Sequence, residues 1–522
     1  MINLTIDNRS VTVPAGTTVL EAARQLNIEI PTLCYLDGCE TFTSCMVCVV
    51  QNVETGRLIP SCSVRVSEGM IIDTESECVR TARKDTLDML LSEHVGDCEA
   101  PCTRTCPAHM NIPQMIRQIQ KGDWAEAIKT VKRDIALPAV LGRICPAPCE
   151  AGCNRKQHDG ALSICLLKRK VADLDLEQDV PYNPEIAEES GKCVAVVGAG
   201  PTGLAAAYYL AIKGHSVTLY EQSNQAGGQL RAAELKDKLP EAILNLEIDQ
   251  IFKLNITFVP DKKLGKDIHL NTLQKDFNAV VLAIGVFDPV LFNGSNLELT
   301  EKGITVDRKT YETNLPGVFA GGNAIGKSNR AIRAVAHGKE MAWAVDQYIR
   351  NKTVIGEPMR FDSRMGKLLL GEIDSYLVEG SDSERLGSDK SGFSDEKAVQ
   401  EALRCFHCDC RKPDTCKLRL YGTEYGAEHT RFKIGPRSGL VKMIQPGHVI
   451  YEPGKCIKCG LCIQIAKAEG ETLGLTFVGR GFNVRVAVPF NETLEKGLTI
   501  AANKCVEACP TAALSVHEKI VG

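Results

Sequence analysis

The chain has 522 residues, of which 44% are hydrophobic and 24% charged, and its 61 Lys and Arg nearly balance its 65 Asp and Glu. This composition is typical of a multidomain globular protein, and a net charge of −4 removes the usual electrostatic argument for binding nucleic acid or an anionic membrane. No apolar run approaches the ~18 residues of a membrane-spanning helix, and the N-terminus lacks the basic and apolar regions of a secretory signal, so we expect a cytoplasmic protein.

Cysteine is the most informative residue type, with 23 copies. A disulfide scaffold would be short and secreted, whereas most cysteines here occur in groups two to four residues apart in a long chain. Such spacing indicates thiolate ligands for metal in a reducing compartment. The sequence therefore predicts redox chemistry.

Residues 1–80 are expected to form a small α+β unit. Residues 3–7 and 10–13 alternate like a hairpin, residues 18–26 have helical spacing, and a cysteine-rich loop follows. The four cysteines are spaced C-x10-C-x2-C-x13-C, which suits two irons and two sulfides better than zinc, because zinc sites usually pair two short knuckles. The predicted ligands are Cys34, Cys45, Cys48 and Cys62. This unit resembles the N-terminal [2Fe-2S] domain of the large iron–sulfur subunit of NADH dehydrogenase and of iron hydrogenases, which implies a β-grasp fold.

Residues 81–180 read as helical, with helical periods at 81–91 and 112–133 and cysteine groups around them. The motifs CEAPCTRTCPAHMNIP and GRICPAPCEAGC resemble the helical double-cluster domain of the glutamate synthase small subunit and of dihydropyrimidine dehydrogenase. That resemblance implies two [4Fe-4S] clusters with interleaved ligands. One cluster would use Cys98, Cys102 and Cys153, and the other would use Cys106, Cys145 and Cys149.

Each of these clusters needs a fourth ligand. His94 precedes Cys98 as H-x3-C, which resembles the histidine-ligated cluster of the NADH dehydrogenase subunit, so we assign it to the first cluster. For the second cluster the family places a polar ligand near residue 168, but this chain has Lys168, which cannot coordinate metal while protonated. Cys165 lies one helical turn earlier and is our predicted substitute.

A Gly-rich turn opens the next domain. Gly198-Ala199-Gly200-Pro201-Thr202-Gly203 joins an apolar strand at 193–197 to a helix at 202–212, and Glu221 follows the next strand, where a carboxylate can accept ribose hydroxyls. Residues 192–350 resemble the FAD domain of the glutamate synthase small subunit, although Asn323 replaces the usual Asp. The residues predicted to bind FAD are Gly198, Gly200, Pro201, Gly203, Glu221, Gly228, Gln229, Leu230, Gly285, Gly322 and Asn323.

The resemblance also indicates a domain that this chain should lack, a second nucleotide-binding domain. Relatives of this type carry a complete second nucleotide domain where this chain has only residues 286–316. Because a single βαβ unit needs ~30 residues, this segment is too short for such a domain. We therefore expect no hydride delivery from NADPH by the family route.

The C-terminal region carries two further cysteine groups. Cys405, Cys408, Cys410 and Cys416 form the unusual pattern C-x2-C-x-C-x5-C, which leaves both a [4Fe-4S] cluster and a structural zinc open. The second group resembles the bacterial ferredoxin run and predicts one [4Fe-4S] cluster, with Cys505 left over. Its ligands would be Cys456, Cys459, Cys462 and Cys509.

The predicted fold class is therefore multidomain α/β and α+β. The expected segments are a [2Fe-2S] β-grasp domain at 1–80, a helical double-cluster domain at 81–180, a Rossmann-like FAD domain at 192–350, a linker at 351–400 and a ferredoxin-like iron–sulfur domain at 401–522. The cofactors would be FAD, one [2Fe-2S] cluster and three or four [4Fe-4S] clusters.

These modules predict an oxidoreductase that acts as an electron-transfer subunit. It would connect a catalytic partner of the formate dehydrogenase or hydrogenase type to ferredoxin or a similar acceptor. The alternatives are a self-contained NAD(P)H-dependent flavoprotein of the glutamate synthase small subunit type and an assembly subunit with a redox-silent flavin. No nucleophile–base constellation is evident, so no catalytic residue is assigned.

Overall fold

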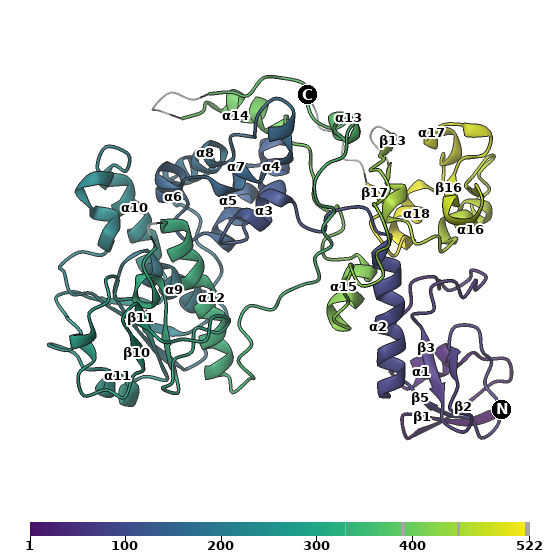
Figure 1. Cartoon of the computed structure of the whole chain (residues 1–522), viewed down its shortest axis with the longest axis horizontal. Helices are drawn as coiled ribbons and strands as arrows, with labels where there is room; N and C mark the ends of the chain where they lie inside the picture. Colours follow the sequence, from purple (N-terminus) through teal and green to yellow (C-terminus); the bar gives the residue numbers. More distant parts are fainter. Residues whose placement is uncertain (329, 388–391, 446–448, 517–522) are drawn as a thin grey trace. The chain divides into compact units, whose positions relative to one another are not determined.

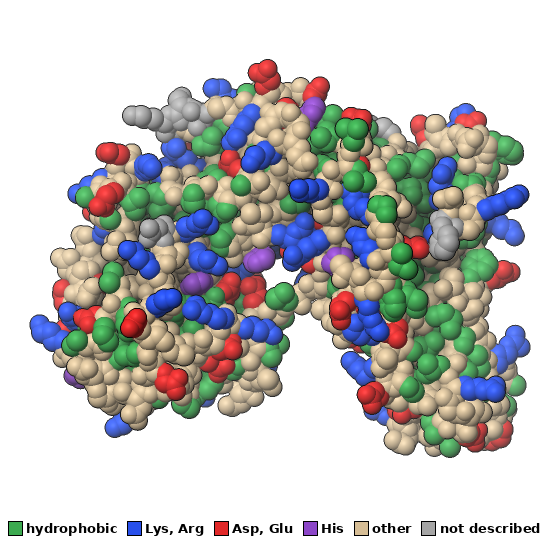
Figure 2. All heavy atoms as spheres, in the orientation of Figure 1, with side chains coloured by type: hydrophobic (Ala, Val, Ile, Leu, Met, Phe, Trp, Pro, Cys, Tyr) green, Lys and Arg blue, Asp and Glu red, His purple; other side chains and the backbone are tan. Residues whose placement is uncertain are grey.

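The computed structural model describes residues 1–328, 330–387, 392–445 and 449–516, and the chain divides into two compact units (Figure 1). The first unit comprises residues 1–100, 359–379 and 407–522, and the second comprises residues 101–358 and 380–406. Basic and acidic side chains are interspersed over the visible face (Figure 2), in keeping with the near-balanced charge. Among the described residues, no helix has the length and apolar character needed to cross a membrane.

The first unit begins with a five-stranded sheet in the order β2-β1-β5-β3-β4. The hairpin of β1 and β2 is antiparallel, and β1 pairs in parallel with β5. The first helix starts at a capping box, in which the Thr18 hydroxyl accepts from the Glu21 amide and the Glu21 carboxylate accepts from the Thr18 amide. The elements are β1 (Ile2–Ile6), β2 (Arg9–Val13), α1 (Val19–Gln25), β3 (Val49–Asn52), β4 (Leu58–Pro60) and β5 (Ile71–Asp73).

The rest of the first unit surrounds a small antiparallel sheet in the order β13-β14-β17. Arg83 of α2 is fully buried and donates to the Val49 carbonyl at 2.9 Å and to the Tyr425 hydroxyl at 2.9 Å, which fixes α2 between the N-terminal sheet and the end of α15. The helices are α2 (Glu77–Ser92), α13 (Glu372–Leu377), α15 (Lys417–Glu424), α16 (Leu461–Ala468), α17 (Leu494–Gly497) and α18 (Ala502–Ala508). The strands are β13 (Met443–Gln445), β14 (Val449–Tyr451), β15 (Thr476–Val478), β16 (Arg485–Ala487) and β17 (Leu514–Val516).

The second unit begins with a helical part. The helical period at 112–133 divides into α4 and α5, because Gly122 takes a positive φ of 69° and the Asp123 carboxylate caps the next helix by accepting from the Glu126 amide at 3.2 Å. The elements are α3 (Pro101–Thr105), α4 (Ile112–Gln120), α5 (Trp124–Asp134), α6 (Pro138–Ile144), α7 (Pro148–Ala151) and α8 (Ile164–Leu176).

A parallel five-stranded sheet in the order β12-β9-β6-β7-β8 follows. Its central strands are almost continuously buried, as expected when helices cover both faces of a parallel sheet. The strands are β6 (Cys193–Val197), β7 (Ser216–Tyr220), β8 (Ile256–Val259), β9 (Ala279–Leu282) and β12 (Val318–Ala320). The helices are α9 (Pro201–Ile212), α10 (Glu241–Phe252), α11 (Leu270–Asp276) and α12 (Ala331–Ile349), and α9 and α12 pack together (Figure 1).

Residues 286–316 contain a short 3-10 turn at Pro289–Phe292 and the two-residue strands β10 (Leu299–Thr300) and β11 (Gly303–Ile304). The predicted linker at 351–400 includes α13 and the start of α14 (Asp395–Ala402). Helix α14 packs on the helical part of the second unit, where the Gln120 side chain donates to the Ala402 carbonyl at 2.8 Å.

Buried polar contacts join the sheet and the helical part of the second unit. Lys339 of α12 donates to Asp134 at the end of α5 at 2.9 Å. The Glu247 carboxylate of α10 accepts from the first two amides of α6, those of Ala139 and Val140, at 2.6 and 2.7 Å. A carboxylate at a helix N-terminus satisfies amides that have no partner within the helix, so this contact fixes α6 against α10.

Candidate cofactor sites

The turn after β6 is shaped for close approach of a ligand. Gly198 has a φ of +103°, and a Cβ there would lie 2.3 Å from the Ala283 carbonyl oxygen. A Cβ on Gly203 would lie 1.8 Å from the Gly198 carbonyl oxygen, so the first turn of α9 packs directly on the turn. Gly200 differs, because a Cβ there would meet nothing within 4 Å among the described residues. The open space therefore lies beside Gly200, where a helix N-terminus favours a phosphate.

A carboxylate and a second glycine segment adjoin this turn. Glu221 is buried, and its two oxygens accept from the Ala199 amide at 2.7 Å and from the Ser223 amide at 3.0 Å. The Gly227 amide donates to the Ala199 carbonyl at 2.8 Å, and a Cβ on Gly228 would lie 3.0 Å from the Gly200 Cα. The predicted residues at 198–203, 221 and 228 are thus brought together.

The segment after β12 closes against α9. A Cβ on Gly322 would lie 2.4 Å from the Thr202 hydroxyl oxygen, and the Gly322 amide donates to His337 Nδ1 at 3.1 Å. The Asn323 side-chain oxygen accepts from the Ser328 amide at 2.9 Å, so this residue also stabilises its own loop. The pairing of His337 with this loop was not predicted, because a histidine within a helix gives no local signal of such a contact.

The remaining predicted FAD residues lie around the same turns. Pro201 is the first residue of α9, Gly285 has a positive φ of 77° three residues after β9, Gln229 is exposed and Leu230 is buried. Close glycine packing, an open position at a helix start and a buried carboxylate together fit a dinucleotide.

A cavity in the second unit is lined by four cysteines and one lysine. The cysteines are Cys106, Cys145, Cys149 and Cys165, which are the predicted second cluster set with its substitute ligand. Lys168 reaches the same cavity, and Ile332, from the first turn of α12, closes another side. The four thiols are therefore grouped as the sequence suggested, and their number fits a [4Fe-4S] cluster.

The thiols and the lysine that line this cavity shift one another's pKa values. A hydrogen bond from the Cys165 thiol lowers the pKa of Cys145 to about 6, and the pKa of Cys165 rises in return. The Lys168 side chain is buried, and no hydrogen bond or ion pair to its ammonium is found within the described part of the chain. Burial disfavours its charge, but the surrounding thiols outweigh burial and raise the pKa of Lys168. Sequence reasoning had identified Lys168 only as a poor ligand.

A second cysteine cavity lies in the first unit, at the start of α16. Its cysteines are Cys456, Cys459, Cys462 and Cys509, the predicted ferredoxin-like set. The Lys458 amide donates to Cys456 Sγ at 3.4 Å. Cys505 is buried nearby and donates to the Cys462 carbonyl at 3.5 Å, but it does not line the cavity.

The [2Fe-2S] candidates are also close together in the first unit. Cys48 Sγ and Cys62 Sγ are 3.4 Å apart, and the Cys45 thiol is hydrogen-bonded to Cys34. These hydrogen bonds lower the pKa of Cys34 to about 5 and that of Cys48 to about 7. All four side chains are buried, so the two thiol pairs fit a site in which protons are exchanged for iron.

The two remaining predicted sets are divided between the units. His94 and Cys98 belong to the first unit, whereas Cys102 and Cys153 belong to the second. Similarly, Cys405 belongs to the second unit, whereas Cys408, Cys410 and Cys416 belong to the first. These ligand sets stay predictions.

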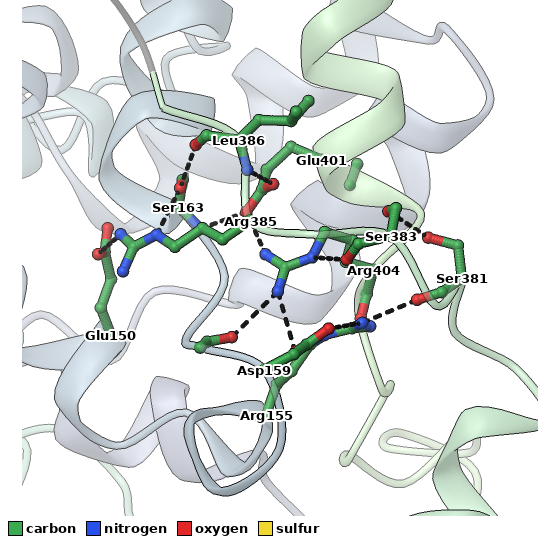
Figure 3. A network of polar contacts seen from close by, with 12 residues as sticks. Glu150, Arg155, Asp159, Ser163, Ser381, Ser383, Arg385, Leu386, Glu401 and Arg404 are labelled. Carbon is green, nitrogen blue, oxygen red and sulfur yellow. Dashed lines mark hydrogen bonds and ion pairs between the residues drawn. The ribbon is translucent and has the colours of Figure 1, made fainter.

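A buried network of polar contacts joins Arg155 and Arg404, the residue before Cys405 in the chain (Figure 3). Arg155, two residues after Cys153, donates to the Arg404 carbonyl and to the Asp159 carboxylate. Arg404 donates to Asp159 at 3.0 Å and to Glu401 at 2.8 Å, and both arginines are almost fully buried. Within the second unit, this network aligns the chain at 404–405 with the chain at 153–155. Nothing in the local sequence marks these two arginines as buried.

Three segments of the chain match known domain families. Residues 1–77 match a 2Fe-2S iron–sulfur cluster binding domain, residues 90–180 match domain II of dihydropyrimidine dehydrogenase with its 4Fe-4S cluster, and residues 165–338 match the pyridine nucleotide-disulphide oxidoreductase family. The predicted fold class and the predicted cofactor types, FAD, [2Fe-2S] and [4Fe-4S], are confirmed at the level of domains. The chain is built from oxidoreductase domains.

Curated proteins that are similar to part of this chain are subunits of oxidoreductases. The β subunit of NADPH-Fe(3+) oxidoreductase of Geobacter sulfurreducens is 34% identical over 45% of this chain and 36% of its own length. The β subunit of NADP(+)-dependent formate dehydrogenase of Moorella thermoacetica is 38% identical over 36% and 29%, and the small chain of glutamate synthase [NADPH] of Bacillus subtilis is 36% identical over 35% and 37%. The predicted resemblance to the glutamate synthase small subunit is thus confirmed. The chain spans only 29% to 37% of the length of these three relatives.

Proposed function

We propose that this chain is an electron-transfer subunit of a cytoplasmic redox complex. It would move electrons through its iron–sulfur clusters and FAD between a catalytic partner, of the formate dehydrogenase or hydrogenase type, and ferredoxin or a similar acceptor. Bound FAD exchanges one or two electrons, whereas each cluster exchanges one.

The proposal rests on one juxtaposition in the second unit. Helix α12 follows the glycine loop at 322–325, which closes on the nucleotide turn, and Ile332 in its first turn lines the cavity of Cys106, Cys145, Cys149 and Cys165. The proposed flavin site and a proposed cluster site would therefore share one helix.

The chain's own residues would hold the two cofactors in a fixed relation. Gly200 leaves room for a pyrophosphate at the start of α9, and Glu221 has unused lone pairs for ribose hydroxyls. The buried contacts of Lys339 with Asp134, and of Glu247 with the start of α6, prevent the sheet from moving against the cluster helices. A fixed geometry suits electron transfer, because the rate of transfer depends on the distance between the cofactors.

The names of the relatives favour a second candidate function, a self-contained NAD(P)H-dependent oxidoreductase of the glutamate synthase small subunit type. The segment at 286–316 argues against this second function. It contains one 3-10 turn and two very short strands, where a second nucleotide domain would be required.

Anaerobic stopped-flow mixing separates the two functions. We expect that neither NADPH nor NADH bleaches the flavin of the isolated chain rapidly and in stoichiometric amount, whereas reduced ferredoxin does reduce the clusters. Rapid bleaching by a pyridine nucleotide would overturn the proposal. Stepwise dithionite titration followed by EPR tests for a redox-silent assembly subunit, which would show no reducible signals. Anaerobic co-purification from the native host would identify the partner subunit.

A further inference from the structure

The first unit brings together three cysteines that the sequence had assigned to different groups. The Cys410 amide donates to the Cys98 carbonyl at 3.2 Å, and the Cys98 amide donates to the Ser363 carbonyl at 3.1 Å. Cys416 caps the start of α15, and its amide donates to the Lys412 carbonyl at 3.1 Å. Two segments more than 300 positions apart thus meet at this point.

The three thiols share one buried environment. Cys98, Cys410 and Cys416 are 8%, 5% and 5% exposed, and none forms a disulfide. Arg419, three residues after Cys416, donates to the carboxylate of Glu99, which follows Cys98, at 2.9 Å, so the segments that carry the three thiols pack against one another. Burying several free thiols together is costly in their charged form unless a cation binds them.

His94 approaches the same place. It lies four residues before Cys98, and the next residue, Val95, donates to the Gly454 carbonyl at 2.8 Å. A Cβ on Gly96, between His94 and Cys98, would lie 2.5 Å from the buried Lys455 side chain, so the segment that carries His94 packs on the chain at 454–455. Cys408 instead lines a polar cavity with Asp97, Tyr376 and Lys442, and Cys98, Cys410 and Cys416 are not among the described residues that line it.

We infer that His94, Cys98, Cys410 and Cys416 bind one [4Fe-4S] cluster in the first unit. Binding would displace three thiol protons, and the imidazole would coordinate in its neutral form. This set replaces the predicted groupings in which Cys98 joined cysteines of the helical domain and Cys410 joined Cys405. The ligands are interrupted by the entire second unit, which explains why no local spacing reveals them.

The site would also have neighbours for electron transfer. Cys416 belongs to the same buried side-chain cluster as Cys34 of the [2Fe-2S] set and Cys459 of the ferredoxin-like set. All three belong to the first unit, so three cluster sites would meet in one contiguous interior.

A double-variant experiment on the full chain tests the ligand set. We expect Cys98→Ser and Cys410→Ser each to lower the iron content by about four and to remove the same EPR signal of the dithionite-reduced protein. The double variant should lose no more than either single variant. Cys78→Ser, at an exposed cysteine, is the matched control and should keep all signals. Loss of two different signals, or of about eight irons in the double variant, would overturn the inference.

The histidine has its own test. Pulsed EPR of the signal lost in Cys98→Ser should show coupling to an imidazole nitrogen, and His94→Cys should abolish that coupling while keeping about four irons. Absence of nitrogen coupling in the unmodified chain would overturn the assignment of His94. Unchanged FAD content and an unchanged [2Fe-2S] signal report correct folding of each variant. These readouts do not depend on the electron-transfer role proposed above, so either proposal can fail alone.

Discussion

The two cysteine cavities, one in each unit, offer the same number of thiols in different surroundings. The empty volume, including space open to solvent, is about 320 Å³ at the cavity of the second unit and about 360 Å³ at the cavity of the first unit. Size therefore does not distinguish the two cavities. The cavity of the second unit contains the buried ammonium of Lys168, whereas none of the described residues that line the cavity around Cys459 is charged. Thiol number decides whether a cluster binds, and nearby charge tunes its reduction potential.

Each cavity also has one cysteine in or near it whose role as a ligand must be decided. Cys165 and Cys505 each donate to a backbone carbonyl at 3.5 Å, those of Leu141 and Cys462 respectively. Only Cys165 lines its cavity and is hydrogen-bonded to another thiol. The comparison therefore favours Cys165, and not Cys505, as a predicted ligand.

The largest effect should come from removing Cys165. Cys165→Ala should lose the cluster of the second unit, with about four irons and one EPR signal. Cys505→Ala, the matched control, should keep its iron, because it removes only the sulfur atom of a side chain that does not line the cavity. A Cys165→Ala protein with full iron and unchanged spectra would show that the fourth ligand lies elsewhere.

The second unit differs again in having the nucleotide turn next to its cavity. Gly200→Ala should fold, since its φ of −77° is ordinary and a Cβ meets no described atom within 4 Å, but the methyl group would occupy the position of the pyrophosphate. We expect at least about tenfold weaker FAD binding, which corresponds to ~1.4 kcal/mol, with unchanged iron. Full FAD occupancy after dilution and gel filtration would contradict this placement.

Lys168 tests the electrostatic difference directly. Replacing it by Met removes a positive charge beside the thiols, so the reduction potential of that cluster should fall by about 60 mV or more, a tenfold change for one electron. Lys168→Arg keeps the charge and should preserve the potential more closely. EPR-monitored redox titration measures both, and the cluster around Cys459 serves as the internal reference. Equal potentials in Lys168→Met and the unmodified protein would remove the contrast between the cavities.

The smallest effect should be a pH dependence confined to the second unit. Burial raises the pKa of Glu247 to about 7, although two helix amides oppose the shift. Because the folded pKa exceeds the unfolded value of 4.5, this group's contribution to stability is complete below pH 4.5 and is lost as pH rises through 7. The midpoint of thermal flavin release should therefore fall by a few degrees between pH 5 and 7.5.

Glu247→Gln should flatten this slope, because the amide does not titrate. A substitution at an exposed acidic residue of the same helix, Glu241→Gln, is the matched control and should leave the slope unchanged. Identical slopes in Glu247→Gln and the unmodified protein would show that another group governs the pH dependence.

Sequence reasoning succeeded where the chemistry is local. The turn at 198–203 and the [2Fe-2S] cysteines each lie within one continuous stretch of about 30 residues or fewer, and the structure brings both groups together as expected. The break between α4 and α5 was missed although Gly122 and Asp123 mark it, because the apolar period continues through both helices. The helical period of the apolar residues shows which face of a helix is buried. A short turn between two helices does not interrupt that period.

Long-range partners could not be predicted in the same way. Cys98 contacts Cys410 through a backbone hydrogen bond that no spacing rule anticipates, since the intervening chain folds as a separate unit. Likewise, Arg404 is buried only because Asp159 and Glu401 compensate its charge, and a residue's type alone does not reveal such compensation.

The division of the chain has a consequence for its biosynthesis. The polypeptide passes between the two units at 100–101, 358–359, 379–380 and 406–407. On the ribosome, the whole second unit is translated before residues 407–522, which make up about half of the first unit. In the nascent chain, the N-terminal sheet must therefore persist without its C-terminal neighbours while more than 300 codons are translated. A single protease cut at any one of the four crossings would yield neither unit as a separate fragment.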